Sequence, residues 1–111
     1  MTTWIDIGAV TDIPRQGARV VKTAQGCVAV FRTITEEVFA LQDRCPHKGG
    51  PLSEGIVHGS KVTCPLHNWV FDMNTGAATG ADEGQVATYP TRVEDGRILL
   101  DVTLLQNRSA A

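Results

Sequence analysis

Short runs of hydrophobic and β-branched residues, separated by segments rich in glycine, asparagine or proline, recur along the whole chain. Helical periodicity is scarce, and such runs are typical of strands joined by tight turns. The pattern therefore predicts an all-β protein, built as a sandwich or barrel. The predicted strands span residues 19–23, 27–32, 38–42, 69–72, 77–79, 89–93 and 98–102, with a short strand on either side of residues 58–61.

Turn-forming residues connect these runs into hairpins. Residues 24–26 join the first two strands, and residues 94–97 join the last two, where the Asp-Gly pair favours a type I′ turn. Residues 58–61 and 73–76 predict two further turns. A single helical turn is expected over residues 9–13, because Pro14 would end it.

Length and charge limit what the protein can be. The 111 residues suffice for one domain, and we expect it to span residues 1–105, followed by a disordered tail at 106–111. Ten basic and twelve acidic residues, with no basic cluster, argue against nucleic acid as a partner. No signal peptide and no apolar run of about 20 residues is visible, so we expect no membrane association. The chain has three cysteines, so a framework of disulfide bonds would leave one cysteine unpaired. We therefore expect a cytoplasmic location, where thiols stay reduced.

Two Cys–His pairs contain the candidate chemistry. Cys45 and His47 form the first pair, Cys64 and His67 form the second, and each pair is expected in a loop that follows a strand. Two thiolates and two imidazoles suit zinc or an iron–sulfur cluster. Zinc fingers usually pair Cys with Cys and His with His, whereas each loop here supplies one of each. This interleaving suits a binuclear cluster, with the cysteines on one iron and the histidines on the other.

The two pairs resemble the ligand boxes of the Rieske family, C-x-H and C-x-x-H. The resemblance continues through residues 50–55, Phe71-Asp72, Thr75-Gly76 and Tyr89-Pro90, so it covers essentially the whole chain. It implies a Rieske-like fold, with antiparallel sheets in a sandwich or partial barrel and a small cluster-binding subdomain of two loops at about residues 44–84.

The same resemblance implies a Rieske-type [2Fe–2S] cluster as the cofactor and electron transfer as the role. It assigns Cys45, His47, Cys64 and His67 as the cofactor-binding residues and metal ligands. No catalytic residue and no independent catalysis are expected from the chain itself.

Within the family, residues 45–55 and 57–72 resemble the small subunit of assimilatory NAD(P)H nitrite reductase. The Asn68-Trp69 pair is the most discriminating feature, since oxygenase ferredoxins typically have Gly after the second His. This resemblance implies a large partner subunit with flavin and sirohaem that reduces nitrite to ammonium in nitrate assimilation. Two alternatives stay open: a free Rieske ferredoxin serving a ring-hydroxylating dioxygenase, and a zinc-stabilised interaction module without a redox role.

Other residues near the boxes are expected to be structural. Cys27 lies in a Val-rich strand without a His partner and is predicted to be in the core. His58 is predicted to be solvated in a turn. Trp69 and Phe71 are predicted to enter the core beside the ligands. Respiratory Rieske proteins have hydroxyl-bearing residues near these two positions, so the resemblance implies a reduction potential towards the low end of the Rieske range.

Overall fold

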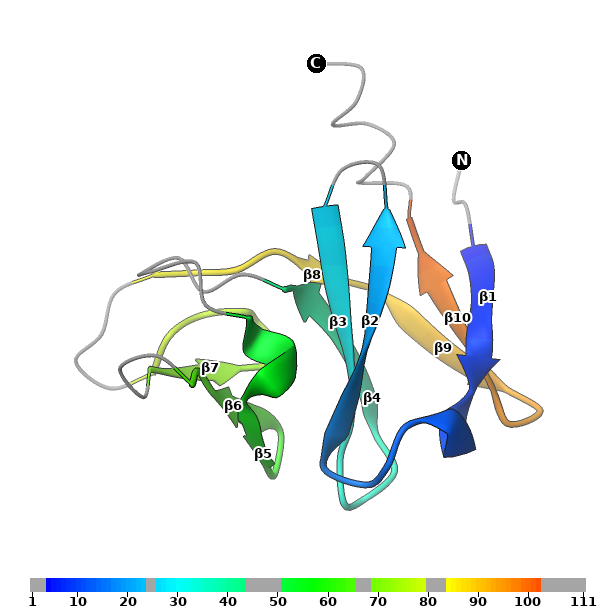
Figure 1. Cartoon of the computed structure of the whole chain (residues 1–111), viewed down its shortest axis with the longest axis horizontal. Helices are drawn as coiled ribbons and strands as arrows, with labels where there is room; N and C mark the ends of the chain where they lie inside the picture. The colour runs from blue at the N-terminus through cyan, green and yellow to red at the C-terminus, as the bar shows by residue number, and fades with distance from the viewer. Residues whose placement is uncertain (1–3, 24–25, 44–50, 66–68, 80–83, 103–111) are drawn as a thin grey trace, which may run out of the picture.

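The computed structural model describes residues 4–23, 26–43, 51–65, 69–79 and 84–102. In this part of the chain the strands form three antiparallel sheets, which we call sheet A (β1-β10-β9), sheet B (β2-β3-β4-β8) and sheet C (β5-β6-β7) (Figure 1). The all-β antiparallel prediction is confirmed. The elements are β1 (Trp4–Ala9), η1 (Val10–Asp12), β2 (Gly17–Thr23), β3 (Gly26–Arg32), β4 (Val38–Gln42), η2 (Leu52–Glu54), β5 (Ile56–His58), β6 (Lys61–Thr63), β7 (Val70–Asp72), β8 (Thr88–Tyr89), β9 (Thr91–Glu94) and β10 (Arg97–Asp101).

Sheet B lies between two hydrophobic cores because β3 is apolar on both of its faces. Val28 and Val30 belong to one core and Ala29 and Phe31 to the other, as the alternation of side chains along a strand requires. The A–B core consists of Ile7, Ile13, Val28, Val30, Ala40, Tyr89, Ile98, Leu100 and Val102. The B–C core consists of Ala29, Phe31, Leu41, Leu52, Val57, Val62, Cys64, Phe71, Met73 and Val86.

Pro90 divides the strand predicted over residues 89–93, so this prediction is wrong in one respect. A proline has no N–H to donate to a ladder, and the pairing changes partner at this point. Strand β8 pairs with β4 in sheet B, whereas β9 pairs with β10 in sheet A. The Pro90 carbonyl accepts a hydrogen bond from the Asp101 N–H at 3.0 Å. The chain therefore passes from one sheet to the next at Pro90.

The turns predicted over residues 58–61, 73–76 and 94–97 are found in the structure, whereas the turn predicted at residues 24–26 lies partly outside the described residues. Among the strands, one prediction is missing and one strand is added. Asp95 (φ 51°) and Gly96 (φ 76°) both adopt positive φ, as a type I′ turn requires. The single helical turn predicted near Pro14 is the 3₁₀ turn η1. Residues 77–79, predicted as a strand, make only isolated bridges, and β1 was not predicted at all.

Within the described residues no helix is long and apolar enough to cross a membrane. The boundaries expected for a single domain, 1–105, stay a prediction. The tail expected at residues 106–111 lies outside the described part of the chain.

Candidate metal centre

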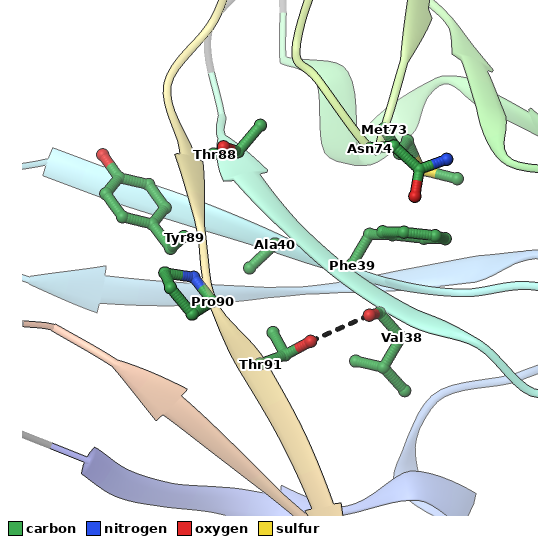
Figure 2. Close-up of a pocket in the computed structure, with 9 residues that line it drawn as sticks. All are labelled: Val38, Phe39, Ala40, Met73, Asn74, Thr88, Tyr89, Pro90 and Thr91. Atoms are coloured by element: carbon green, nitrogen blue, oxygen red, sulfur yellow. Dashed lines mark hydrogen bonds between the residues drawn. The ribbon is translucent and has the colours of Figure 1, made fainter.

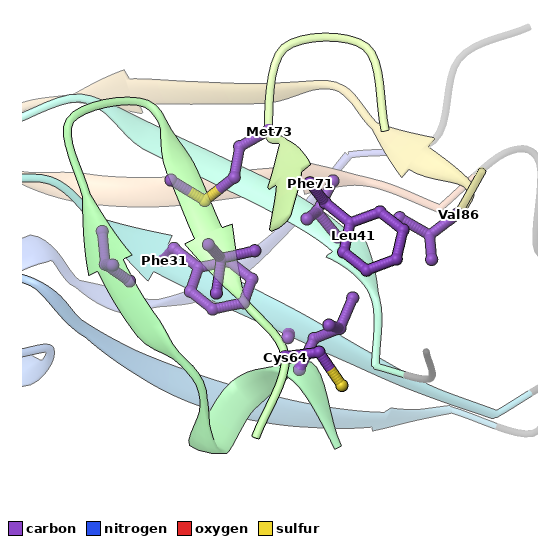
Figure 3. Packing of buried hydrophobic residues seen from close by; sticks show 10 residues of the cluster. Phe31, Leu41, Cys64, Phe71, Met73 and Val86 are labelled. Atoms are coloured by element: carbon purple, nitrogen blue, oxygen red, sulfur yellow. The ribbon is translucent and has the colours of Figure 1, made fainter. Parts of the chain in front are cut away.

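Cys64 is the one predicted ligand that lies within the described residues. It directly follows β6, its side chain is 0% exposed, and it belongs to the B–C core together with Leu52 and Phe71. Figure 3 shows Cys64 at the edge of the packed side chains, with its sulfur directed away from Met73. The apolar surroundings of a metal ligand control the access of solvent to it, and at Cys64 they exclude water from the side chain.

A backbone hydrogen bond closes the β6–β7 hairpin at the position of Cys64. The Cys64 N–H donates to the carbonyl oxygen of Trp69 at 2.6 Å, immediately beyond the last paired residues of the hairpin, Thr63 and Val70. The bond extends the ladder by one step. It fixes where the segment that contains His67 leaves β6 and where it returns to β7.

The other three predicted ligands, Cys45, His47 and His67, lie outside the residues that the structure describes. Among the described side chains, no group of three or more His, Cys, Asp or Glu is placed to hold a metal ion. The four-residue ligand set therefore stays a prediction, to which the structure contributes the location of Cys64.

The two aromatic residues after the second box pack where the sequence predicts them. Phe71 is 0% exposed in the B–C core, and the half-buried Trp69 packs against the same core. Their ring centroids are 6.3 Å apart at an interplanar angle of 39°, a tilted arrangement that aromatic pairs favour. They cover the core next to Cys64 with apolar surface.

The prediction for Cys27 is wrong, and that for His58 is confirmed. Cys27 is exposed, because it stands at the outer end of β3, before the run that both cores cover. Alternation along a strand predicts which face of the sheet a residue occupies, but not how far the hydrophobic cores extend along the strand. His58 is exposed at the end of β5, with its Nε2 2.7 Å from the Thr63 hydroxyl oxygen.

The carboxyl groups with shifted pKa values lie on β1 and on the turn between β3 and β4. A hydrogen bond from Arg97, with a second from the Gly8 N–H, lowers the pKa of Asp6. Hydrogen bonds from Arg32 and then from Arg15 lower the pKa of Glu36. The Asp6–Arg97 pair is exposed on both sides, while in the Arg32–Glu36 pair the carboxylate is exposed and the Arg32 side chain is only 11% exposed. Both carboxylates lie at the surface, so they indicate surface structure rather than a reactive centre.

A groove of about 450 Å³ lies between β4, the β8–β9 corner and the turn after β7 (Figure 2). Its lining includes Phe39, Met73 and Tyr89, and the Thr91 hydroxyl donates to the Val38 carbonyl oxygen at 2.8 Å across it. No Cys, His, Asp or Glu is among the residues that line the groove.

Comparison of the sequence with known proteins points to one family. A family model described as the Rieske-like [2Fe-2S] domain matches residues 3–101. The ferredoxin component of the naphthalene 1,2-dioxygenase system of Pseudomonas aeruginosa is 33% identical, over 90% of this chain and 96% of the relative. The ferredoxin subunit of anthranilate 1,2-dioxygenase from Burkholderia cepacia is 36% identical, over 92% of this chain and 94% of the relative.

Similar solved structures come from two functional groups. A Mycobacterium tuberculosis protein assigned as the small subunit of an NADH-dependent nitrite reductase matches with a TM-score of 0.82 and 26% identity, covering 91% of this chain and 96% of that one. The ferredoxin of carbazole 1,9a-dioxygenase from Nocardioides aromaticivorans matches with a TM-score of 0.79 and 26% identity, covering 88% of this chain and 96% of that one. The fold is common to both groups.

Proposed function

The chain belongs to the family of Rieske-like [2Fe-2S] domains, and we propose that it is the ferredoxin component of a multicomponent ring-hydroxylating dioxygenase. As a member of this family it has a Rieske-type [2Fe–2S] cluster as its cofactor and works in electron transfer. The partners in this proposal are a reductase that supplies electrons and a terminal oxygenase that consumes them. Within such a system the chain carries electrons and transforms no substrate.

End-to-end similarity to dioxygenase ferredoxins is the observation that carries this proposal. The naphthalene and anthranilate dioxygenase ferredoxins align with this chain over nearly their whole length, at 33% and 36% identity. A Rieske domain within a larger oxygenase gives a different result, since the 4beta-methylsterol monooxygenase of Methylococcus capsulatus is matched over only 26% of its length. The relatives thus support a dioxygenase ferredoxin, which was one of the two alternatives from the sequence, better than they support a nitrite reductase subunit.

The chemistry of the donor set fits a cluster of this kind. We propose Cys45, His47, Cys64 and His67 as its ligands, two thiolates and two imidazoles, as in Rieske centres. Cys64 fits a thiolate ligand because it is fully buried at the start of a loop and is surrounded by apolar residues. When bound, the cluster supplies one-electron redox chemistry. The proposed ligands would hold it, and Leu52 and Phe71 would exclude water beside Cys64.

The small subunit of nitrite reductase is the second candidate. Two observations favour it: the TM-score of 0.82 to the Mycobacterium tuberculosis protein, and the Asn68-Trp69 pair after the second box. Both candidates need the same cluster and the same four ligands, so they differ only in the partner. For either one the cytoplasm is the proposed location, since an exposed and unpaired thiol at Cys27 fits a reducing compartment.

Affinity purification of the tagged chain from its own cells, followed by identification of the bound proteins, separates the two candidates. The proposal expects a terminal oxygenase, with a mononuclear iron site, to be recovered with the chain. Recovery of a sirohaem- and flavin-containing subunit instead would overturn it in favour of nitrite reductase.

Electron delivery provides the matching functional measurement. The chain is reduced anaerobically and mixed with the recovered oxygenase, in its oxidised form, and with the aromatic substrate. The recovery of the visible absorption that the cluster lost on reduction is then followed in time. We expect oxygenase-dependent reoxidation, and none with a chain lacking Cys64. A colourless protein that contains zinc would support the third alternative, the interaction module.

A further inference from the structure

Two hydrogen bonds join the ends of the segment that contains Cys45 and His47. The Ser53 N–H donates to Oδ1 of Asp43 at 2.8 Å, and the Ser53 hydroxyl donates to Oδ2 of the same carboxylate at 2.9 Å. Asp43 directly follows β4, and Ser53 is the middle residue of η2. We call this pair of bonds the Asp43–Ser53 clasp.

Both sides of the clasp are fixed to the rest of the fold. On the Asp43 side, its N–H donates to the Cys27 carbonyl oxygen at 3.0 Å, so the residue is held against β3. On the Ser53 side, Leu52 is 0% exposed in the B–C core that also contains Cys64. The Gly55 N–H donates to the Leu52 carbonyl oxygen at 2.9 Å and ends η2. The clasp thus ties sheet B to η2.

The chemistry of the clasp makes it more than a surface contact. Hydrogen bonds to an ionised carboxylate are about twice as strong as those between neutral groups, and both bonds here are partly buried. Both oxygens of one side chain bind one residue, which fixes orientation as well as distance. The second ligand segment, in contrast, is closed by the backbone bond between Cys64 and Trp69, which no side-chain substitution removes.

We propose that Asp43 is a positioning residue for the metal centre. By holding the two ends of the segment 44–52 together through Ser53, it limits the positions that the proposed ligands Cys45 and His47 can take. This inference rests on the proposed ligand set. Removal of a residue that orients metal ligands without binding the metal itself typically lowers the metal affinity by about 10- to 100-fold.

Substitutions at Ser53 test the proposal without changing charge near the cluster. Ser53→Ala removes the hydroxyl bond and keeps the N–H bond, while Ser53→Thr keeps both. We expect Ser53→Ala to lose its cluster to a chelator on the order of 10-fold faster than the wild type. Its reduction potential and EPR g-values should shift, and Ser53→Thr should restore wild-type values.

Asp43→Ala removes both bonds and should lose the cluster fastest, by up to roughly 100-fold. Asp12→Ala is the matched control. The Asp12 carboxylate likewise accepts a backbone N–H bond, from Ala9 at 2.9 Å, but it belongs to η1. We expect this variant to keep the wild-type potential, EPR spectrum and rate of cluster loss.

Each outcome has one meaning. If Ser53→Ala and Asp43→Ala match Asp12→Ala in rate, potential and spectrum, the positioning role is wrong. If Asp43→Ala does not fold, Ser53→Ala decides alone. If the wild-type chain itself shows no Rieske signal after reconstitution, the proposed ligand set and function fail instead.

Discussion

The A–B core and the B–C core share sheet B, but different structures enclose them. The A–B core is closed by β1, of six residues, and β10, of five, which pair along most of their length. The B–C core is closed by three strands of three residues each, by η2 and by loops. Its buried residues include Cys64, whereas the buried residues described for the A–B core include no cysteine. Long ladders pair the strands that close the A–B core, whereas short elements close the B–C core, which contains the proposed ligand Cys64.

The largest expected effect comes from removing the thiol of the B–C core. Cys64→Ser should abolish the EPR signal of the reduced protein, because a hydroxyl is a poor ligand for iron in place of a thiolate. The circular dichroism spectrum should change little, since the two side chains are similar in size. Cys27→Ser is the control, and it should keep the full signal because Cys27 is exposed at the end of β3. A Cys64→Ser protein with an intact Rieske signal would remove Cys64 from the ligand set.

Substitution of one equally buried leucine in each core allows a direct comparison of the two cores. Leu52 and Leu100 are both 0% exposed, the first in the B–C core and the second in the A–B core. Each substitution to alanine should lower the free energy of unfolding by about 2–5 kcal/mol, measured by urea denaturation. Only Leu52→Ala should also speed the loss of the cluster to a chelator. Equal rates of cluster loss in the two variants would show that the cores are not functionally distinct.

Two glycines with similar positive φ angles allow a second comparison, between the turn after β7 and the β9–β10 hairpin. Gly76, between β7 and the B–C core residue Val86, has φ 78°, and Gly96, in the β9–β10 hairpin, has φ 76°. Gly96→Ala meets no neighbouring atom and should cost about 1–2 kcal/mol for the left-handed backbone alone. Gly76→Ala would also place its Cβ against the Val86 carbonyl oxygen, which adds about 1–3 kcal/mol, so we expect about 2–5 kcal/mol in total. Similar urea midpoints for the two variants would contradict this reading of the turn after β7.

The smallest effect is a pH dependence confined to sheet A. The hydrogen bond from Arg97, followed by that from the Gly8 N–H, lowers the pKa of Asp6. A lowered pKa stabilises the fold above the pKa of the unfolded chain, and this contribution is lost as the pH falls through the folded value. The difference in urea midpoint between the wild type and Asp6→Asn should therefore shrink as the pH falls below 3.8, the ordinary pKa of an aspartate. The rate of cluster loss at neutral pH should not change in this variant.

Local patterns predicted the hairpins, because turn chemistry and strand alternation are both encoded within a few residues. The Asp-Gly pair at 95–96 forms the expected turn, and the strand predicted at 38–42 has the bounds of β4. Properties that depend on distant residues were missed. The change of partner at Pro90 depends on where sheets A and B meet, and the exposure of Cys27 depends on how far both cores extend along β3.

The same limit applies to the site. Spacing and residue type predicted the four ligands, and the family match supports the cluster that they imply. The Asp43–Ser53 clasp was not predicted, because its residues lie ten positions apart on either side of the first box, and no local pattern indicates that their side chains meet. The choice of partner rested on the Asn68-Trp69 pair, which is too short a feature to outweigh end-to-end similarity to dioxygenase ferredoxins.

The position of β3 between the two cores has a consequence for how reliably the chain folds. If β3 slid by one residue against β2 and β4, Val28 and Val30 would exchange faces with Ala29 and Phe31. The bulky phenylalanine would then enter the space of a valine on one side, and a gap would open on the other. A one-residue slip is therefore penalised in both cores, which favours the observed register of β3 during folding.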